Sequence, residues 1–430
     1  LQIKIMMKTK RSLLTLLALL GGFSSAALSL DMSVEVGAGL EHTDNANKTK
    51  TNTISELQSK ASADFSLQHG GSEVTFELGY RAEYTHYDKD SQEDDTTLEG
   101  DALLIYEQIA NTLTWTLENS RRSVLKDKAL DDLQSNREDR SISSIAPRLI
   151  LKLSSRDSLI FDASYTDIQY DDSDQQDSSR IGVGMLWAHN LSAVDALSAR
   201  LQYQDVSFEK QQSVNDYEYY LVTLGYQAKL SRLSYSVDAG VNQSKRKTDD
   251  YEGYYFNGNL DYQYHANTFS LTLVHELTDT SRGDNNEGLG DFNNSSGDID
   301  IFERSNAELS FTNKSLCDTC SIRVFALEEL EDYENLNQDS REFRAGINFG
   351  YQLTRLLTAG IEVDYSDLRF VNGNGDADYD TLRYRLRLQQ SLSRELSLDW
   401  FVSFEDKTSD GGLQNYDELR GGVSLSYRFD

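Results

Sequence analysis

Proline is almost absent from this sequence. Pro147 is the single proline among 430 residues, whereas an average usage near 5% would give about twenty. Proline has no N–H to donate to a strand ladder, and in a closed barrel every strand is hydrogen-bonded on both sides, so no edge is left for it. The scarcity of proline therefore favours a closed β-barrel.

Long apolar segments are missing as well. After Ala27 no stretch approaches the roughly 18 consecutive apolar residues of a spanning helix, and the mean hydropathy is -0.56. These two features exclude an α-helical membrane protein. A secreted soluble domain has a similar composition, so the choice between it and a barrel depends on the pattern of residues along the chain.

Positive charge is scarce. The sequence has 41 Lys and Arg against 71 Asp and Glu, a net charge of -30. Removal of an N-terminal signal would take four more basic residues and leave -34. Nucleic-acid binding depends on basic surfaces, so no nucleic-acid partner is expected.

Cysteine is limited to Cys317 and Cys320, three residues apart in a short connection. In an oxidising compartment two cysteines this close are expected to form a disulfide. A redox centre or half of a zinc site is the alternative, but no second cysteine pair and no sequence-near histidine supports it. Closing so small a ring contributes only about 2 kcal/mol, so the bond pins a turn.

The N-terminus has the pattern of a secretory signal peptide. Lys8, Lys10 and Arg11 precede an apolar run over 13–20, and small residues follow to Ala26 and Ala27. Cleavage near Ala26 or Ala27 divides the chain into a signal peptide, 1–27, and a single domain, 28–430. Residues 1–5 precede the first methionines, so translation could start after them.

From residue 33 onward, alternating strands of about 12 residues predict the fold. In residues 73–87, Val74, Phe76 and Leu78 share one face, and Thr75 and Glu77 share the other. A period of two residues indicates strands. Polar and charged residues on the second face do not suit a dry sandwich core but suit a water-filled lumen.

The sequence predicts a strict alternation of short and long connections, such as 110–111 and 231–232 against 126–140 and 282–301. Short turns at one end and long loops at the other are typical of outer-membrane barrels. We therefore predict an all-β, antiparallel, up-and-down transmembrane barrel of about 20 strands, within a range of 16 to 20. Barely ten residues separate the cleavage site from the first strand, so no plug domain is expected.

Alternation also predicts which side chains line the lumen. Inward aromatics that could stack on sugar rings are expected at Tyr220, Tyr226, Tyr255 and Phe401. The charged lumen residues form a larger set: Arg81, Glu83, Arg200, Asp238, Asp261, Glu362, Asp364, Arg383, Arg385, Arg387, Asp399 and Arg420. Opposite charges on neighbouring strands either neutralise one another or offer hydrogen bonds to a hydrated solute.

A barrel of this size should be open unless a loop folds inward, and 126–140 and 282–301 are the candidates. The second loop is rich in Asp and could hold calcium, although its spacing is not that of an EF-hand and a solvated loop is the alternative. The six histidines are scattered and no nucleophile motif is present, so we expect no enzyme, no cofactor and no resident metal.

Three short segments are distinctive: the glycine-containing strand 34–42 followed by Thr43-Asp44-Asn45, the run 84–88, and the strand and turn 351–357. In these segments the chain resembles the outer-membrane porins encoded with exopolysaccharide and exosortase-type systems. The last strand, 419–429, resembles the C-terminal signal read by the barrel-assembly machinery, except that Asp430 follows the terminal aromatic.

This resemblance implies a conduit for a secreted polysaccharide, embedded in outer-membrane lipid and working with a periplasmic polysaccharide export protein. Composition and spacing alone reach only a wide pore. An uptake porin for oligosaccharides or other small solutes remains an alternative, as does an adhesive or structural barrel.

Overall fold

The computed structural model describes residues 30–209, 215–281, 299–317, 319–371, 378–412 and 414–429. The predicted signal peptide lies outside the described residues. Twenty strands make up the structure: β1 (Asp31–Thr43), β2 (Glu56–Gly70), β3 (Val74–Tyr87), β4 (Asp95–Ile109), β5 (Leu113–Leu125), β6 (Arg137–Lys152), β7 (Asp157–Tyr170), β8 (Ser178–Asn190), β9 (Asp195–Phe208), β10 (Tyr217–Lys229), β11 (Leu233–Arg246), β12 (Asp250–Tyr264), β13 (Asn267–Asp279), β14 (Ile301–Asn313), β15 (Cys320–Tyr333), β16 (Ser340–Thr354), β17 (Leu357–Phe370), β18 (Tyr379–Ser391), β19 (Leu396–Ser409) and β20 (Tyr416–Phe429).

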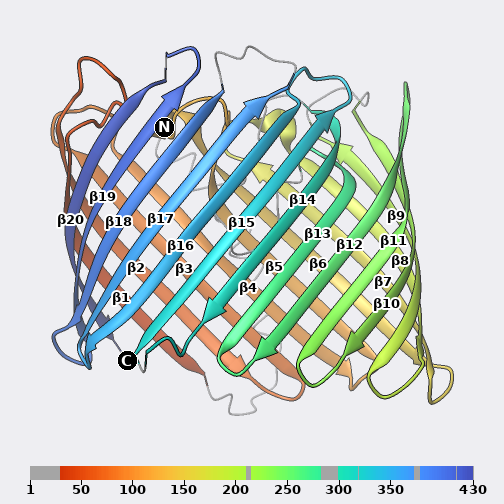
Figure 1. The fold of residues 1–430 in the computed structure, drawn as a ribbon. Coiled ribbons are helices and arrows are strands. Elements are labelled where there is room, and N and C mark those ends of the chain that lie inside the picture. The colour runs from red at the N-terminus through yellow and green to blue at the C-terminus, as the bar shows by residue number, and fades with distance from the viewer. Residues whose placement is uncertain are drawn as a thin grey trace.

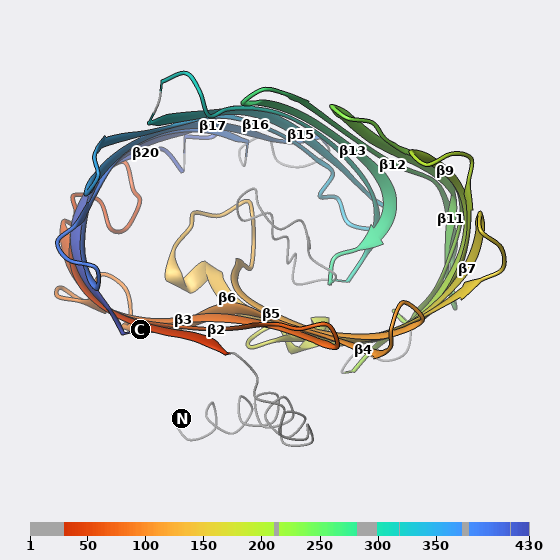
Figure 2. The same ribbon diagram turned by 90° about the horizontal axis from the view of Figure 1, so that it is seen from below.

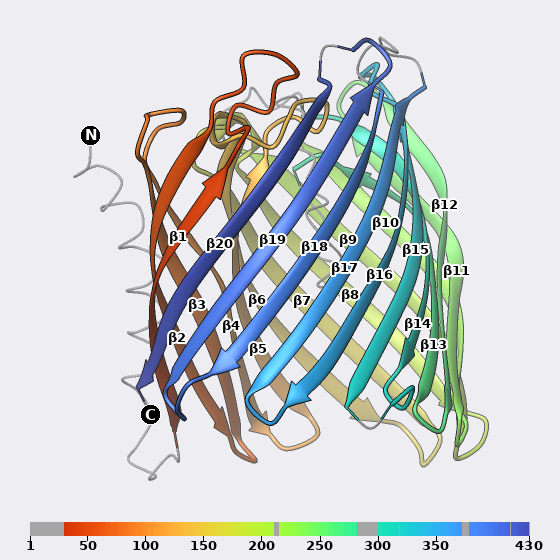
Figure 3. The same ribbon diagram turned by 60° about the vertical axis from the view of Figure 1, so that its left-hand side comes forward.

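The strands close into one barrel, as predicted (Figures 1 and 3). Each strand pairs antiparallel with the next, and β20 pairs with β1 from Val34 opposite Phe429 to Thr43 opposite Arg420. Following the register once around the barrel returns to β1 about 26 residues further along, which corresponds to a strand tilt of about 45°. Closure leaves the sheet without a free outer strand, so the ladders satisfy the backbone without help from solvent.

The connections divide the barrel into two ends. At the short-turn end, tight turns join β2 to β3, β4 to β5 and every second pair thereafter, and β1 begins and β20 ends there. The other connections lie at the long-loop end. The predicted strict alternation is wrong at one place, because residues 247–249 join β11 to β12 at the long-loop end by a three-residue turn. The Arg246 N–H donates to the Asp249 carbonyl at 2.9 Å and closes this turn.

The outer face of the barrel is apolar through its middle. Leu224, Tyr254 and Leu386 are 71%, 76% and 56% exposed, and their sequence neighbours on the opposite face are polar or glycine. Such a band is the surface that hydrocarbon covers in a membrane barrel. Among the described residues, neither short 3-10 helix, η1 (Gln134–Asn136) or η2 (Asp174–Gln176), is long and apolar enough to span a membrane.

Pro147 lies inside β6 and not at an edge, where the closed-barrel argument left no place for it. The ladder between β6 and β7 is interrupted there, since Ile145 pairs with Tyr165 and the pairing resumes at Arg148 with Asp162. The missing N–H of proline is thus accommodated by a local break in one ladder.

The lumen near the long-loop end contains an apolar core, which the alternation did not predict. Val206, Phe208, Tyr217, Leu277 and Ile301 are buried together there. They come from β9, β10, β13 and β14, so the ends of β13 and β14 pack against the inner wall formed by β9 and β10.

Candidate functional site

The register identifies the inner face of every strand. Residues 126–136, between β5 and β6, lie inside the barrel (Figure 2), and they contact Glu331, Ser340, Tyr379 and Lys407 on the opposite wall. These four side chains are therefore on the inner face, and alternation along the paired strands assigns the rest. All twelve charged residues predicted to line the lumen have this inner-face register.

Three of these arginines lie on β18 with acidic residues on both neighbouring strands. Arg383 is opposite Asp364 on β17 and Glu405 on β19, and its Nε donates to Glu405 Oε2 at 2.6 Å. Arg385 Nη1 lies 3.8 Å from Glu362 Oε2 on β17. Arg387 and Asp399 lie nearer the short-turn end, with Arg387 opposite Phe401.

Charge pairing continues around the seam between β20 and the first strands. Arg420 Nη1 donates to Glu41 on β1 at 2.8 Å, and Arg420 Nη2 donates to Glu418 at 2.8 Å. On β3, Arg81 donates to Glu83 at 2.9 Å and lies 3.6 Å from Asp64. Six of the twelve predicted lumen charges, Arg81, Glu83, Glu362, Arg383, Arg385 and Arg420, thus lie in ion pairs with a neighbour, one of the two outcomes that the sequence left open.

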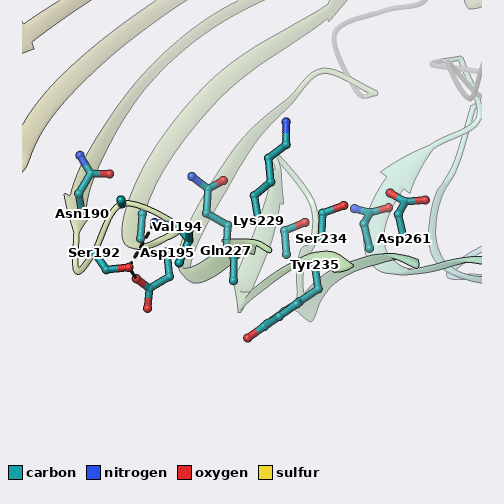
Figure 4. A pocket seen from close by; sticks show the side chains of 14 residues that line it. Asn190, Ser192, Val194, Asp195, Gln227, Lys229, Ser234, Tyr235 and Asp261 are labelled. Carbon is teal, nitrogen blue, oxygen red and sulfur yellow. Dashed lines mark hydrogen bonds between the residues drawn. The ribbon is translucent and has the colours of Figure 1, made fainter. Parts of the chain in front are cut away.

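The remaining three predicted residues lie on the wall formed by β9 to β12. Arg200 and Asp238 are opposite Thr223 and Gly225 of β10. Asp261 accepts a hydrogen bond from Ser270 at 2.6 Å and borders a shallow hollow of about 440 Å³ near the short-turn end. In Figure 4 the side chains of Gln227, Lys229 and Asp261 point to one side of this wall and Tyr235 points to the other.

Two of the four predicted inward aromatics are wrong. Tyr220 and Tyr226 alternate with the inner-face residues Leu221, Thr223 and Gly225, so they lie on the outer face. Tyr220 packs there against Tyr203, and Tyr226 against Tyr235. Phe401 and Tyr255 have the inner-face register.

Residues 126–136 form a constriction loop that crosses the lumen from β5 and β6 (Figure 2). Its backbone and side chains are fixed to the wall formed by β15 to β19. Tyr379 donates to the Lys128 carbonyl at 3.0 Å, and Gln414 donates to the Ala129 carbonyl at 2.5 Å. A loop held at both its carbonyls and its side chains narrows the pore in one defined position. One of the two inward-loop candidates named from the sequence is thereby confirmed, and the other, 282–301, lies mostly outside the described residues.

Two lysines fasten the constriction loop in opposite directions. Lys128 reaches from the loop to Glu331, and to the Ser340 hydroxyl at 2.7 Å. Lys407 reaches from β19 to Asp131 of the loop at 2.7 Å and lies 3.7 Å from the centre of the Tyr379 ring. Both ion pairs are shielded from water, so the attraction within each pair is little screened and loss of either partner would leave a shielded charge without its counter-ion.

Below the loop, a cavity of about 430 Å³ remains along the wall. Its lining is mixed in charge, with Arg344 and Arg383 beside Glu342 and Asp364, and includes Phe325. Asp132 of the loop also lines it. Although burial would raise its pKa, the Arg137 guanidinium and the nearby Lys48 hold the pKa of the Asp132 carboxyl below its usual value. The arrangement suits hydrated solutes, because it offers both donors and acceptors along one path.

Cys317 and Cys320 are joined, with their Cα atoms 5.2 Å apart, in the connection from β14 to β15 at the short-turn end. The bond is far from the constriction loop in the fold.

Within the ranges that the structure describes, no three His, Cys, Asp or Glu side chains form a group that could hold a metal ion. Of the acidic residues of the second loop that could hold calcium, Asp284, Glu287, Asp291 and Asp298 lie outside the described residues. The fifth, Asp300, is described and accepts hydrogen bonds from the Asn335 and Leu336 N–H groups at 2.7 and 2.8 Å.

The sequence did not identify the residues that fasten the loop. Alternation marks Lys407 and Tyr379 as inner-face residues, but no sequence signal indicates that residues 128–131 meet a wall more than 200 positions away. That contact depends on how the closed barrel brings β5 opposite β15 to β19.

No protein-family model matches the sequence, and no curated protein matches it. Solved structures do resemble the barrel. The FrpB iron transporter of Neisseria meningitidis is 10% identical with a TM-score of 0.49, over 96% of this chain and 83% of that one. The outer-membrane protein OpdK of Pseudomonas aeruginosa is 11% identical with a TM-score of 0.41, over 93% and 99%. OmpT with loop L8 deleted, an outer-membrane protein of Vibrio cholerae, is 11% identical with a TM-score of 0.40, over 94% and 100%.

Proposed function

We propose that this chain is exported through a signal peptide, cleaved near Ala26 or Ala27, and forms a water-filled pore in the bacterial outer membrane. The observation that carries the proposal is the division of one closed sheet into an apolar outer face and a charged inner face. Apolar side chains facing lipid and ion-paired side chains facing the lumen are stable only if the barrel separates hydrocarbon from water. The proposal assigns no catalytic step to the chain.

The solute class is hydrophilic and rich in hydroxyl groups. The inner wall alternates guanidinium and carboxylate groups, as at Arg383 and Glu405, and carries the aromatic ring of Phe401 within 5.9 Å of Arg385. Sugars use such surfaces, since their hydroxyls donate and accept hydrogen bonds and their apolar faces stack on rings. The finer proposal, supported by the family resemblance, is secretion of an exopolysaccharide delivered by a periplasmic export protein.

Uptake of small solutes is the second candidate, and the constriction loop favours it. A polymer needs a continuous channel, whereas a pore narrowed by residues 126–136 passes oligosaccharides or smaller molecules more readily. Export through the same pore requires that the loop yields to the polymer.

Two experiments test these proposals. Purified protein in planar bilayers should give ohmic steps of conductance, and absence of any conductance would contradict the pore. In cells, loss of surface polysaccharide on deletion of the gene, with normal growth on oligosaccharides, supports export. Full surface polysaccharide with poor growth on an oligosaccharide supports uptake and overturns export.

A further inference from the structure

The seam between β12 and β13 is paired over only part of its length. The ladder runs from Tyr264 opposite Asn267 to Phe256 opposite His275 and stops there. In contrast, β13 stays paired with β14 as far as Asp279, and β12 stays paired with β11 as far as Asp250. Within the described residues, 250–255 of β12 therefore lack a ladder partner on the β13 side. The ladder between β4 and β5 also stops short, at Gly100 opposite Arg121.

Beyond His275, β13 turns into the lumen. In the paired part Phe269 and Leu273 face outward, and alternation would place Leu277 on the same outer face. Instead Leu277 is 2% exposed and packs in the apolar core with Val206 and Tyr217. A Cβ built on Gly253 of β12 would lie 3.7 Å from the Leu277 Cβ, so β13 here lies against the inner side of β12 and not beside it.

Polar contacts hold the turned-in strand. With its amide oriented to satisfy both partners, Asn242 of β11 donates to the Gly253 carbonyl at 2.9 Å and accepts from the Leu277 N–H at 2.8 Å. The Asn242 side chain thus bridges a backbone carbonyl of β12 and a backbone N–H of β13 in the part of the seam where the two strands have no ladder. From five strands away around the barrel, Arg180 Nη1 of β8 lies 2.9 Å from Asp279 Oδ2, and both side chains are buried. The two contacts join β13 to strands that are not its neighbours.

We propose that this seam is a gate with two pairings of the same strands. Continuing the present register upward would set Tyr254 opposite Leu277 and Gly253 opposite Thr278. Zipping would return Leu277 to the lipid-facing row beside Tyr254, which is already 76% exposed. It would also separate Arg180 from Asp279 and remove β13 from the lumen. The turned-in pairing is the closed form, and the zipped pairing is the open form.

Cysteine pairs that share residue 277 separate the two forms. Gly253→Cys with Leu277→Cys suits the turned-in form, because the Cβ distance of 3.7 Å is within the range for a disulfide. Tyr254→Cys with Leu277→Cys suits only the zipped form, since the two side chains now lie on opposite faces of β12. Both pairs are oxidised in membranes, with Leu277→Cys alone as the control, and mass spectrometry distinguishes the new bond from Cys317–Cys320.

Both disulfides should form. The disulfide between positions 254 and 277 should raise single-channel conductance at least about twofold over the disulfide between positions 253 and 277, and reductant should reverse the difference. The gate is overturned if the cysteines at positions 254 and 277 stay reduced under an oxidant that joins those at positions 253 and 277. Equal conductances of the two disulfide-locked forms would also overturn it. The conductance measurement rests on the proposed pore function, whereas disulfide formation does not. If neither form conducts and both bonds form, the pore fails and the two pairings stand.

Discussion

Lys407 is the most informative single position for testing how the pore is narrowed. Its side chain is 5% exposed and donates to Asp131 of the constriction loop, whose side chain is 15% exposed. Replacement by Met keeps the length of the side chain and removes the charge. The Asp131 carboxylate would then be buried beside the Tyr379 ring without this cation.

The magnitudes favour release of the loop. Leaving one partner of a buried ion pair uncompensated costs about 3 to 5 kcal/mol. Of the contacts that remain, those of the Lys128 ammonium with Glu331 and Ser340 contribute about 1.5 to 3 kcal/mol each, and that of the Ala129 carbonyl with Gln414 contributes about 0.5 to 1.5 kcal/mol. Ordering the loop backbone costs about 1 kcal/mol or more per residue. A released loop returns Asp131 to water, so Lys407→Met should shift the population toward an open lumen.

Conductance in planar bilayers and trypsin digestion measure this shift. Lys407→Met should conduct more than the parent and become sensitive to cleavage after Lys128, which is fastened in the lumen of the parent. Lys245→Met is the matched control, because Lys245 is an exposed lysine on the outer face that also lies near a tyrosine ring. Equal conductance and equal digestion of the parent, Lys407→Met and Lys245→Met would refute the role of the Lys407–Asp131 ion pair in holding the constriction loop.

Three further predictions concern the strand register, the disulfide and the constriction loop. Leu386→Arg, on the lipid-facing row of β18, should destabilise folding in lipid by about 2 to 4 kcal/mol in denaturant titrations, while Gln389→Arg on the inner row should be nearly neutral; equal losses would mean that the register is wrong. Cys317→Ser should keep the heat-modifiable mobility of a closed barrel, and loss of assembly would show that the disulfide is essential. Because Arg137 holds the pKa of Asp132 below its usual value, the contact stabilises the loop above about pH 4 and is lost as the pH falls through the lowered pKa, so conductance should rise in acid; an Asp132→Asn variant with the same acid response would assign that response elsewhere.

The sequence alone determined the alternating strands and the side of the wall on which most residues lie, and it limited the number of strands to between 16 and 20. A period of two depends only on neighbouring residues, and turn residues mark the strand ends. For this reason alternation by itself places Arg383, Arg385 and Arg387 on one row. The same reasoning failed at Tyr220 and Tyr226, because aromatic residues suit both the membrane-facing row and a solute path, and only the pairing of β10 with Asp238 and Val241 of β11 fixes which row is inside.

What crosses the lumen was decided only by tertiary structure. The contact of Lys128 with Glu331 joins residues 203 positions apart, and it exists because closure of twenty strands sets β5 and β6 opposite β15 to β19. The turn of Leu277 into the lumen likewise contradicts its own alternation, since burial with Val206 and the Arg180–Asp279 pair outweighs the continuation of one ladder. Local patterns specify which face of a strand is apolar, whereas the filling of a closed barrel depends on distances across it, which no local pattern encodes.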